Sequence, residues 1–244
     1  FYVCYMKVRI VDSGKSSAAS HMAKDRDLLE SLQDGELILH LYEWENPCSL
    51  TYGHFMRPEK FLLSNYADLG LDAAVRPTGG GFVFHKGDYA FSVLMSATHP
   101  SYSSSVLENY HTVNSFVAKV LEKVFRIQGM LAPEDENSSS RDSGNFCMAK
   151  TSKYDVLFGD KKIGGAAQRK VQQGFLHQGS LFLSGSSSEF YQRFLKPEVL
   201  EEIIEQIQIH AFFPLGLEAA DEVLQEARQQ VKEAFIKLFC GEGL

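Results

Sequence analysis

The sequence predicts a single domain that combines β-strands with amphipathic helices. Short apolar runs bounded by turn residues recur between residues 8 and 183, which is typical of strands. Apolar residues also recur at helical spacing in several longer segments, the last of which ends near residue 239. Because no stretch between the two halves has the composition of a linker, we expect residues 1–244 to form one domain.

The composition excludes several classes of function. The 244 residues are 44% hydrophobic and carry a formal net charge of −7, which disfavours nucleic-acid binding. No apolar run approaches the roughly 20 residues that span a bilayer, and the charged N-terminus does not have the pattern of a signal peptide. The four cysteines are scattered, so we expect neither a metal site nor a disulfide framework. We therefore expect a cytoplasmic monomer.

The first third of the chain predicts strands separated by helices. Apolar runs predict strands at residues 8–11, 37–44 and 49–53. Helical spacing predicts helices at residues 21–32 and 58–69, and Gly70 would end the second of these. The polar, serine-rich residues 12–20 are predicted to form a loop.

The most unusual stretch is Arg76-Pro-Thr-Gly79-Gly80-Gly81, which leads into Phe-Val-Phe-His85. Consecutive glycines let backbone amides approach a ligand closely, so the run can cradle an anion or an activated acyl group. It is neither a Walker A loop nor a dinucleotide fingerprint, because the required Gly-Lys-Ser/Thr and Gly-x-Gly-x-x-Gly spacings are absent. The alternative is a glycine-rich turn that binds nothing.

Alternation along residues 82–85 predicts which side chains face a site. Residues 82–85 and 89–95 predict two neighbouring strands joined by a tight turn at residues 86–88. In an extended chain Val83 and His85 share one face, while Phe82 and Phe84 share the other. We therefore expect His85 to face a cavity and the two phenylalanines to face a core.

The second half predicts a long helix, three strands and a helical tail. Helical spacing predicts helices at residues 106–127, 197–205 and 217–239, with Pro197 at the start of the second. Strands are predicted at 155–158, 162–163 and 175–183, the first two joined by a turn at Gly159-Asp160. The polar segment 133–144 is predicted to be a mobile surface loop, with a lid over the site as the functional alternative.

A second unusual run joins a lysine to small residues. Lys162 is followed by Ile-Gly-Gly165-Ala-Ala167-Gln, and His177-Gln-Gly179-Ser follows further along the chain. Small residues allow a ligand to lie against the backbone, and an ammonium group can reach its carbonyl or carboxylate oxygen. By itself, the run fits an ordinary hairpin with surface lysines better than a ligand site.

Together, these motifs in this order resemble the lipoate–protein ligase A and octanoyltransferase family, which is related to biotin–protein ligase. The resemblance implies an α+β fold with a mixed, largely antiparallel sheet flanked by helices and a narrow tunnel for an eight-carbon acyl chain. It implies transfer of lipoyl or octanoyl to a lysine of a lipoyl domain, either in a 2-oxoacid dehydrogenase complex or in the glycine cleavage H protein. The helical segment 197–244 would be a tail, without a separate accessory domain.

The resemblance also assigns roles to individual residues. Arg76 and the three glycines Gly79, Gly80 and Gly81 would hold the activated acyl group, with His85 beside it. Lys162 would contact the acyl carbonyl or phosphate. The remaining matched residues would line the tunnel, namely Gly165, Ala167, His177 and Gly179.

The family uses two mechanisms, and both stay open for this sequence. A ligase activates lipoate or octanoate with ATP and Mg²⁺ to form an acyl-adenylate, and the full glycine triplet favours this mechanism. A transferase takes octanoyl from acyl carrier protein as a cysteine thioester and needs no cofactor. Cys147 lies 15 positions before Lys162, which resembles the spacing in one branch of transferases. A third alternative is a non-catalytic relative that binds the acyl group or a lipoyl domain.

Overall fold

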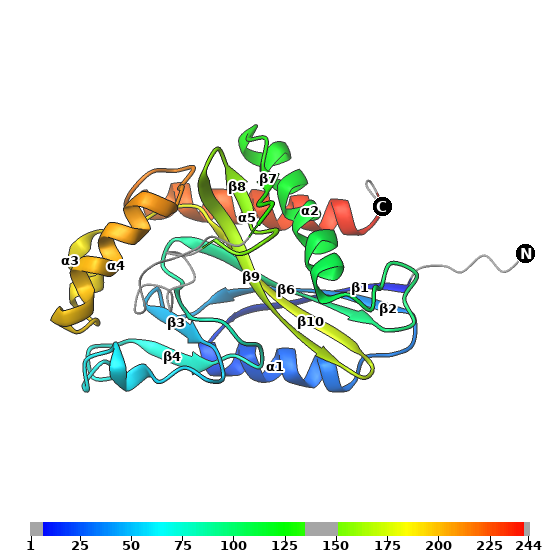
Figure 1. Ribbon diagram of the computed structural model, residues 1–244, viewed down its shortest axis with the longest axis horizontal. Coiled ribbons are helices and arrows are strands. Elements are labelled where there is room, and N and C mark those ends of the chain that lie inside the picture. The colour runs from blue at the N-terminus through cyan, green and yellow to red at the C-terminus, as the bar shows by residue number, and fades with distance from the viewer. Residues whose placement is uncertain (1–6, 135–150, 242–244) are drawn as a thin grey trace, which may run out of the picture.

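A seven-stranded sheet forms the centre of the structure, and helices cover both of its faces (Figure 1). The computed structural model describes residues 7–134 and 151–241. In spatial order, the strands are β1 (Lys7–Ser16), β2 (Glu36–Trp44), β6 (Asp88–Ser96), β10 (Gly174–Phe182), β9 (Lys161–Val171), β8 (Val156–Phe158) and β7 (Met130–Leu131). The pair β1–β2 is parallel and the other pairs are antiparallel, which confirms the predicted mixed sheet.

A smaller sheet lies beside the first and carries the glycine-rich turn. Its strands, in spatial order, are β4 (Asp72–Val75), β3 (Ser49–Tyr52) and β5 (Phe82–Phe84). The glycine-rich residues 76–81 connect β4 to β5. This small sheet packs its apolar face against α3 (Ser188–Gln192) and α4 (Pro197–His210).

The long helices pack on opposite faces of the large sheet. In Figure 1, α2 (Val106–Phe125) and α5 (Asp221–Phe239) lie above the sheet, and α1 (Ala18–Glu30) lies below it. The odd-numbered residues of β2 and β6, such as Leu39 and Phe91, join the core with α2 and α5. Even-numbered residues face α1 instead. This alternation confirms that the predicted strands are buried on both faces. No helix in the described part of the chain is long and apolar enough to cross a bilayer.

Residues that are paired across neighbouring strands form rows on the α1 face of the sheet, and these rows differ in polarity and side-chain size. One row joins Ile38, Leu94 and Leu176 and is apolar. The next row is polar and joins His40, Ser92, Gln178 and Ala167. The third row joins Ala90, Ser180 and Gly165, whose side chains are small. A row of small side chains next to a polar row leaves room for a groove that runs across the strands.

The predicted helix at residues 58–69 is wrong. The structure has only one 3-10 turn there, η1 (Pro58–Lys60). The following backbone pairs with a distant segment, because the Leu63 N–H donates to the Phe194 carbonyl at 2.9 Å and the Lys196 N–H donates to the Phe61 carbonyl at 2.8 Å. Burial of Phe61 in the α3–α4 core favours this extended pairing over local helical bonds.

The loop predicted at residues 12–20 is largely absent. β1 continues to Ser16 because it pairs in parallel with β2 through a bulge, where Gly14 has a φ of 60°. Helix α1 then starts one residue after its N-cap Ser17, whose hydroxyl accepts a hydrogen bond from the Ser20 N–H. Ser16 therefore ends β1 and Ser17 caps α1, although the sequence analysis had assigned both serines to a loop.

The predicted hairpin of residues 82–85 and 89–95 is also wrong, because the two strands belong to different sheets. β5 pairs with β3, whereas β6 pairs with β2 and β10. The chain crosses between the sheets at Gly87, whose carbonyl accepts hydrogen bonds from the Leu183 and Ser184 N–H groups. A Cβ at Gly87 would lie 1.9 Å from the Ser184 carbonyl oxygen, so the crossing requires glycine.

Candidate active site

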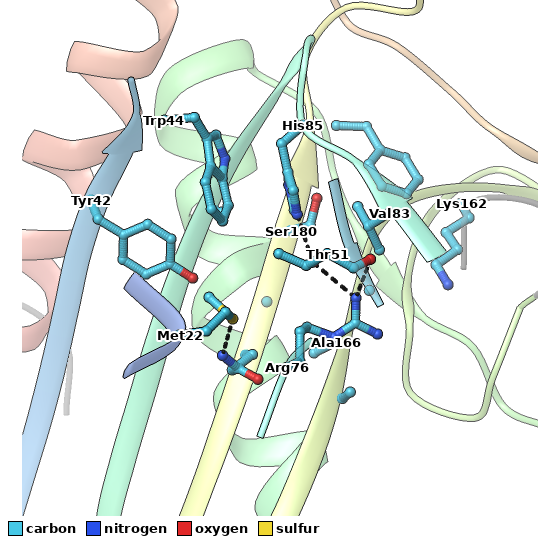
Figure 2. A pocket seen from close by; sticks show the side chains of 16 residues that line it. Met22, Tyr42, Trp44, Thr51, Arg76, Val83, His85, Lys162, Ala166 and Ser180 are labelled. Carbon is cyan, nitrogen blue, oxygen red and sulfur yellow. Dashed lines mark hydrogen bonds between the residues drawn. The ribbon is translucent and has the colours of Figure 1, made fainter. Parts of the chain in front are cut away.

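A cavity lies between the large sheet and the small one, above the row of small side chains. It is narrow and partly open to solvent, with a volume of about 40 Å³ available to the centre of a water-sized sphere. The floor is formed by residues such as Ala90, Gly165 and Gly179 on three adjacent strands. Tyr42 and Lys162 lie at opposite ends of the lining (Figure 2). Because adjacent strands lie roughly 4.8 Å apart, the three intervals from β9 to β2 give the groove a length of roughly 14 Å.

Lys162 is held at its end of the cavity by a buried carboxylate. The Lys162 Nζ lies 2.7 Å from the Asp155 Oδ2, and both side chains are 5% exposed or less. Tyr110 of α2 donates a hydrogen bond to the other oxygen of Asp155 and accepts one from the Ala166 N–H at 2.9 Å. Burial and the Asp155 carboxylate raise the pKa of Tyr110 well above its ordinary value of 10.0, so the phenol stays a neutral donor. The ammonium group is thereby fixed at the edge of β9.

Gly165 provides the space in which the Lys162 side chain lies. A Cβ at this position would lie 2.4 Å from the Lys162 Cε and 2.6 Å from its Nζ. These distances are shorter than any real Cβ contact, so a side chain at residue 165 would displace the ammonium group. The small residue is therefore needed for the ion pair as well as for the floor of the cavity.

The Arg76 guanidinium stabilises the glycine-rich turn through hydrogen bonds to its backbone carbonyls. Its Nη2 donates to the carbonyls of Gly79 and Gly81 at 2.9 and 2.8 Å, and its Nη1 donates to the carbonyl and the hydroxyl of Thr51. Because the C=O and N–H of a trans peptide point in opposite directions, the Gly80 N–H points away from the guanidinium. The backbone amide, rather than the arginine, is thus free to face an anionic ligand at this exposed residue.

The turn also depends on a glycine of the neighbouring strand. A Cβ at Gly53 would lie 2.0 Å from the Gly80 carbonyl oxygen, so only glycine lets the two segments approach. Gly80 itself has a φ of 87°, which is the left-handed region. The His54 N–H then donates to the Thr78 carbonyl and joins the segments.

The polar row of the sheet forms one wall of the cavity. Asp25 of α1 is fully buried and accepts hydrogen bonds from Ser92 and Gln178, each at 2.6 Å, and from His40 at 2.7 Å. Gln178 also accepts a hydrogen bond from the Thr78 hydroxyl at 2.7 Å, which ties this wall to the glycine-rich turn.

The structure brings most of the predicted site residues together. The cavity is lined by Arg76, His85, Lys162, Gly165, Ala167 and Gly179. The alternation prediction is confirmed, because Val83 and His85 line the cavity while Phe82 and Phe84 belong to the core. The glycines Gly79, Gly80 and Gly81 are not among the lining residues, but Arg76 joins the carbonyls of Gly79 and Gly81 to the cavity wall.

His177 lies away from this cavity, and Cys147 cannot be placed relative to it because it lies outside the described residues. His177 lies on the opposite face of β10, where its ring contacts those of Tyr110 and Phe91. Complete burial lowers the pKa of His177 to about 3, so this imidazole is neutral. Cys147, together with most of the predicted loop at residues 133–144, lies outside the described residues.

The sequence analysis did not identify the residues that position the functional side chains through hydrogen bonds or ion pairs. Asp25, Thr51, Tyr110 and Asp155 lie in segments without a motif, and each reaches the site through folding of distant parts of the chain. A single buried aspartate in a helix gives no local signal of its partner.

Comparisons with known proteins agree with this geometry. Residues 52–186, more than half of the chain, match the model of the Biotin/lipoate A/B protein ligase family. The chain is 27% identical over 234 residues to the octanoyltransferase LipM of Kyrpidia tusciae, covering 93% of this chain and 85% of that protein. It is 30% identical over 243 residues to the octanoyltransferase LipM of Geobacillus kaustophilus, covering 95% and 84%.

A solved structure of low sequence identity shares the fold. The chain superposes with a TM-score of 0.65 on a chain from the structure of the bi-partite lipoate protein ligase and its E2 lipoyl domain from Thermoplasma acidophilum. The two chains are 19% identical, and the match covers 97% of this chain and 93% of that one. This likeness confirms the ligase-like architecture that the motifs implied.

Proposed function

Because the chain belongs to the biotin/lipoate A/B protein ligase family, we propose that it attaches an octanoyl or lipoyl group to a lysine of a lipoyl domain. The observation that supports this most is the buried Lys162–Asp155 pair at one end of a groove with a small-residue floor. A groove of roughly 14 Å accommodates a medium-length acyl chain, with its carbonyl carbon near the ammonium group. The relatives named above are octanoyltransferases.

The ammonium group of Lys162 would act on the acyl carbonyl oxygen. Attack on the carbonyl carbon places negative charge on this oxygen, and a cation held in a buried site stabilises that charge more than water does. Asp155 fixes the position of the cation, so little reorganisation is needed when the charge develops. The Gly80 N–H is a second donor for the activated end of the acyl group.

We propose the transferase mechanism as the first alternative. The Cys147 thiolate would attack the carbonyl carbon of octanoyl carrier protein, forming an enzyme thioester and releasing the carrier thiolate. The neutral amine of the target lysine would then attack this thioester, forming the amide and releasing Cys147 as a thiol that takes up the proton lost by the amine. The names of the relatives support this mechanism, as does the spacing of Cys147 and Lys162.

An ATP-dependent ligase is the second candidate, and the glycine-rich turn favours it. Among the described residues, nothing lies within 4 Å of a Cβ built on Gly79, so this part of the structure leaves space for a bulky group beside the backbone of the turn. An acyl-adenylate carries a phosphate that backbone N–H groups can bind. ATP and Mg²⁺ would be required for this reaction.

One experiment separates these mechanisms. The protein is incubated with an apo lipoyl domain and either octanoyl carrier protein or lipoate with ATP and Mg²⁺, and both proteins are weighed by mass spectrometry. The transferase mechanism predicts acylation from the carrier and a hydroxylamine-labile adduct on the enzyme that is absent in Cys147→Ser. Acylation that requires ATP and persists in Cys147→Ser would establish the ligase instead.

A binding protein without catalytic activity gives a third pattern. In that case neither donor would acylate the lipoyl domain, and Lys162→Ala would leave the function of the protein in cells unchanged. Lack of acylation by either donor, also with an added accessory subunit, would therefore refute the enzymatic proposal.

A further inference from the structure

A chain of hydrogen bonds runs from a buried carboxylate of the large sheet to the glycine-rich turn. The Asp88 Oδ2 lies 2.7 Å from the His85 Nδ1, and the His85 Nε2 lies 2.8 Å from the Thr51 hydroxyl. The Arg76 Nη1 donates to that hydroxyl at 3.0 Å, and its Nη2 holds the turn. The chain Asp88–His85–Thr51–Arg76 is called the relay below. Neither sequence motif included Thr51.

The relay crosses the boundary between the two sheets, where the cavity lies. Asp88 belongs to β6 of the large sheet, whereas Thr51 belongs to β3 of the small one. Three relay residues line the cavity, and Figure 2 shows Thr51 between His85 and Arg76. All four side chains are 5% exposed or less, so water does not compete for these bonds. A change at Asp88 is therefore transmitted to the wall of the acyl groove.

Donor and acceptor chemistry fixes the proton on His85. An ionised carboxylate only accepts, so the His85 Nδ1 carries a hydrogen toward Asp88. Arg76 only donates, so the Thr51 oxygen accepts from it and the single hydroxyl hydrogen is available for the His85 Nε2. The four groups satisfy one another when His85 is neutral and protonated on Nδ1. With Nε2 protonated, the Thr51 oxygen would accept from both His85 and Arg76, and its own hydrogen would lose His85 as an acceptor, so the Nδ1 tautomer uses more of the available donors.

The surroundings hold the imidazole in this position. The Trp44 ring stacks on His85 with centroids 4.1 Å apart and an interplanar angle of 25°. Ser180 donates to the Asp88 Oδ2 at 2.6 Å. The other oxygen of Asp88 is buried and has no hydrogen-bond partner among the described residues. A buried, half-satisfied carboxylate costs stability, so its presence is better explained by positioning than by folding.

We propose that Asp88 and Thr51 are positioning residues, which fix the His85 tautomer and thereby hold Arg76 and the Gly79–Gly81 carbonyls in the geometry that receives the activated acyl group. This inference rests on the proposed function, because its effect is exerted on acyl transfer. Neither residue touches the reacting atoms. Their contribution is made through the orientation of three consecutive glycines, which have no side chains of their own to hold them.

The test uses a pair of variants that differ by one hydroxyl group. Thr51→Val keeps the shape of the side chain but removes the donor to His85 and the acceptor for Arg76, whereas Thr51→Ser keeps both. Because a lost hydrogen bond to a charged group misplaces the turn, we expect kcat/KM for acyl transfer to fall about 10- to 100-fold in Thr51→Val. Thr51→Ser should stay within about threefold of the wild type, since the hydroxyl remains.

The ¹⁵N NMR spectrum of histidine-labelled protein reports the relay independently of activity. The His85 signals are identified by their loss in His85→Gln. We expect a protonated Nδ1 and an unprotonated Nε2 in the wild type and in Thr51→Ser. In Thr51→Val the Nε2 loses its hydrogen-bond donor, so its signal should shift. Asp88→Asn should populate the other tautomer, because the amide has a donor that can face Nδ1.

The outcomes distinguish the relay from the proposed function. Full kcat/KM in Thr51→Val would overturn the inference, and so would a wild-type His85 protonated on Nε2. Loss of activity in Thr51→Ser as severe as in Thr51→Val would also overturn it, because the hydroxyl would then be irrelevant. Wild-type protein with the expected tautomer but without acyl transfer would refute the proposed function, and with it the role of the relay in that reaction.

Discussion

Substitution of Gly165 by alanine tests whether the position of the Lys162 ammonium group controls the reaction. The new Cβ would lie 2.4 Å from the Lys162 Cε and 2.6 Å from its Nζ, and 3.0 Å from the Asp155 Oδ1. Carbon contacts begin at about 3.5 Å, so the end of the lysine must move by about 1 Å. Displacement of a group at the reacting centre by this amount costs about 100-fold in rate.

The effect on stability should be much smaller than the effect on rate. The displaced atoms are the end of a flexible side chain, so the fold can adjust, and we expect Gly165→Ala to lower the free energy of unfolding by about 1–2 kcal/mol. The rate is measured as acylation of an apo lipoyl domain, and stability by urea unfolding. A loss of both in the same proportion would show that the variant acts through misfolding instead.

A double-mutant cycle shows whether the loss passes through Lys162. In the background of Lys162→Ala the added methyl group no longer meets the lysine, and its close contact is with the Asp155 Oδ1 at 3.0 Å, so Gly165→Ala should lower the residual rate little further. An additional 100-fold loss in that background would show that Gly165 matters only as part of the floor of the groove and does not act through Lys162. Wild-type activity in the single variant Gly165→Ala would refute the reasoning, because the cation would then be able to move without consequence.

Three further predictions concern the buried groups around the site. Asp155→Asn should lower the free energy of unfolding by about 3–5 kcal/mol in urea titrations, because it leaves the buried ammonium of Lys162 without its carboxylate; a loss under 1 kcal/mol would contradict this. Gly179→Ala should cost about 1–3 kcal/mol, since its Cβ would lie 2.3 Å from the Phe91 ring, and Phe91→Leu should recover part of the loss. The pKa of His177 is lowered from 6.5 to about 3 by burial. Below pH 6.5 the unfolded chain binds a proton that the folded chain does not, so stability should fall by about 1.4 kcal/mol per pH unit as the pH decreases toward 3; His177→Gln should give a shallower slope in unfolding titrations between about pH 4 and 7.

Local patterns predicted the strands that form the site, because their apolar runs are buried on both faces. The Val83–His85 alternation placed one side chain correctly at the cavity, since strand periodicity needs no knowledge of the partner strand. The same reasoning failed for residues 82–95, which cross from one sheet to the other. A turn sequence does not reveal whether its flanking strands pair with each other.

The predicted helix at residues 58–69 failed for a related reason. Its apolar residues fit a helix, but Phe61 and Leu62 pack against residues 190–195, more than one hundred positions away. Long-range burial outweighed the local preference, which amounts to only a few tenths of a kcal/mol per residue. The predictions that failed concern segments whose backbone hydrogen bonds are made with distant parts of the chain.

The site itself was predicted as two motifs, and the structure shows what joins them. Three buried carboxylates of the described residues fix the side chains that line the cavity, each from a different segment of the chain. Asp25 on α1 holds Gln178, Asp88 on β6 holds His85, and Asp155 before β8 holds Lys162. None of the three lines the cavity. Each instead fixes the donor or cation that does.

Small residues form the groove, and buried carboxylates outside it orient the polar groups. This separation of roles explains how a groove of small residues can have a defined geometry. Glycine and alanine provide space but no orientation, so the positions of the polar groups must be set from behind the groove wall. A buried carboxylate does this well, because its partner cannot exchange it for water and must keep one orientation. As a consequence, the interior contains buried charges, and removal of the partner of any one of them destabilises the fold. A variant at any of the three aspartates should therefore reduce acyl transfer even though no carboxylate touches the substrate.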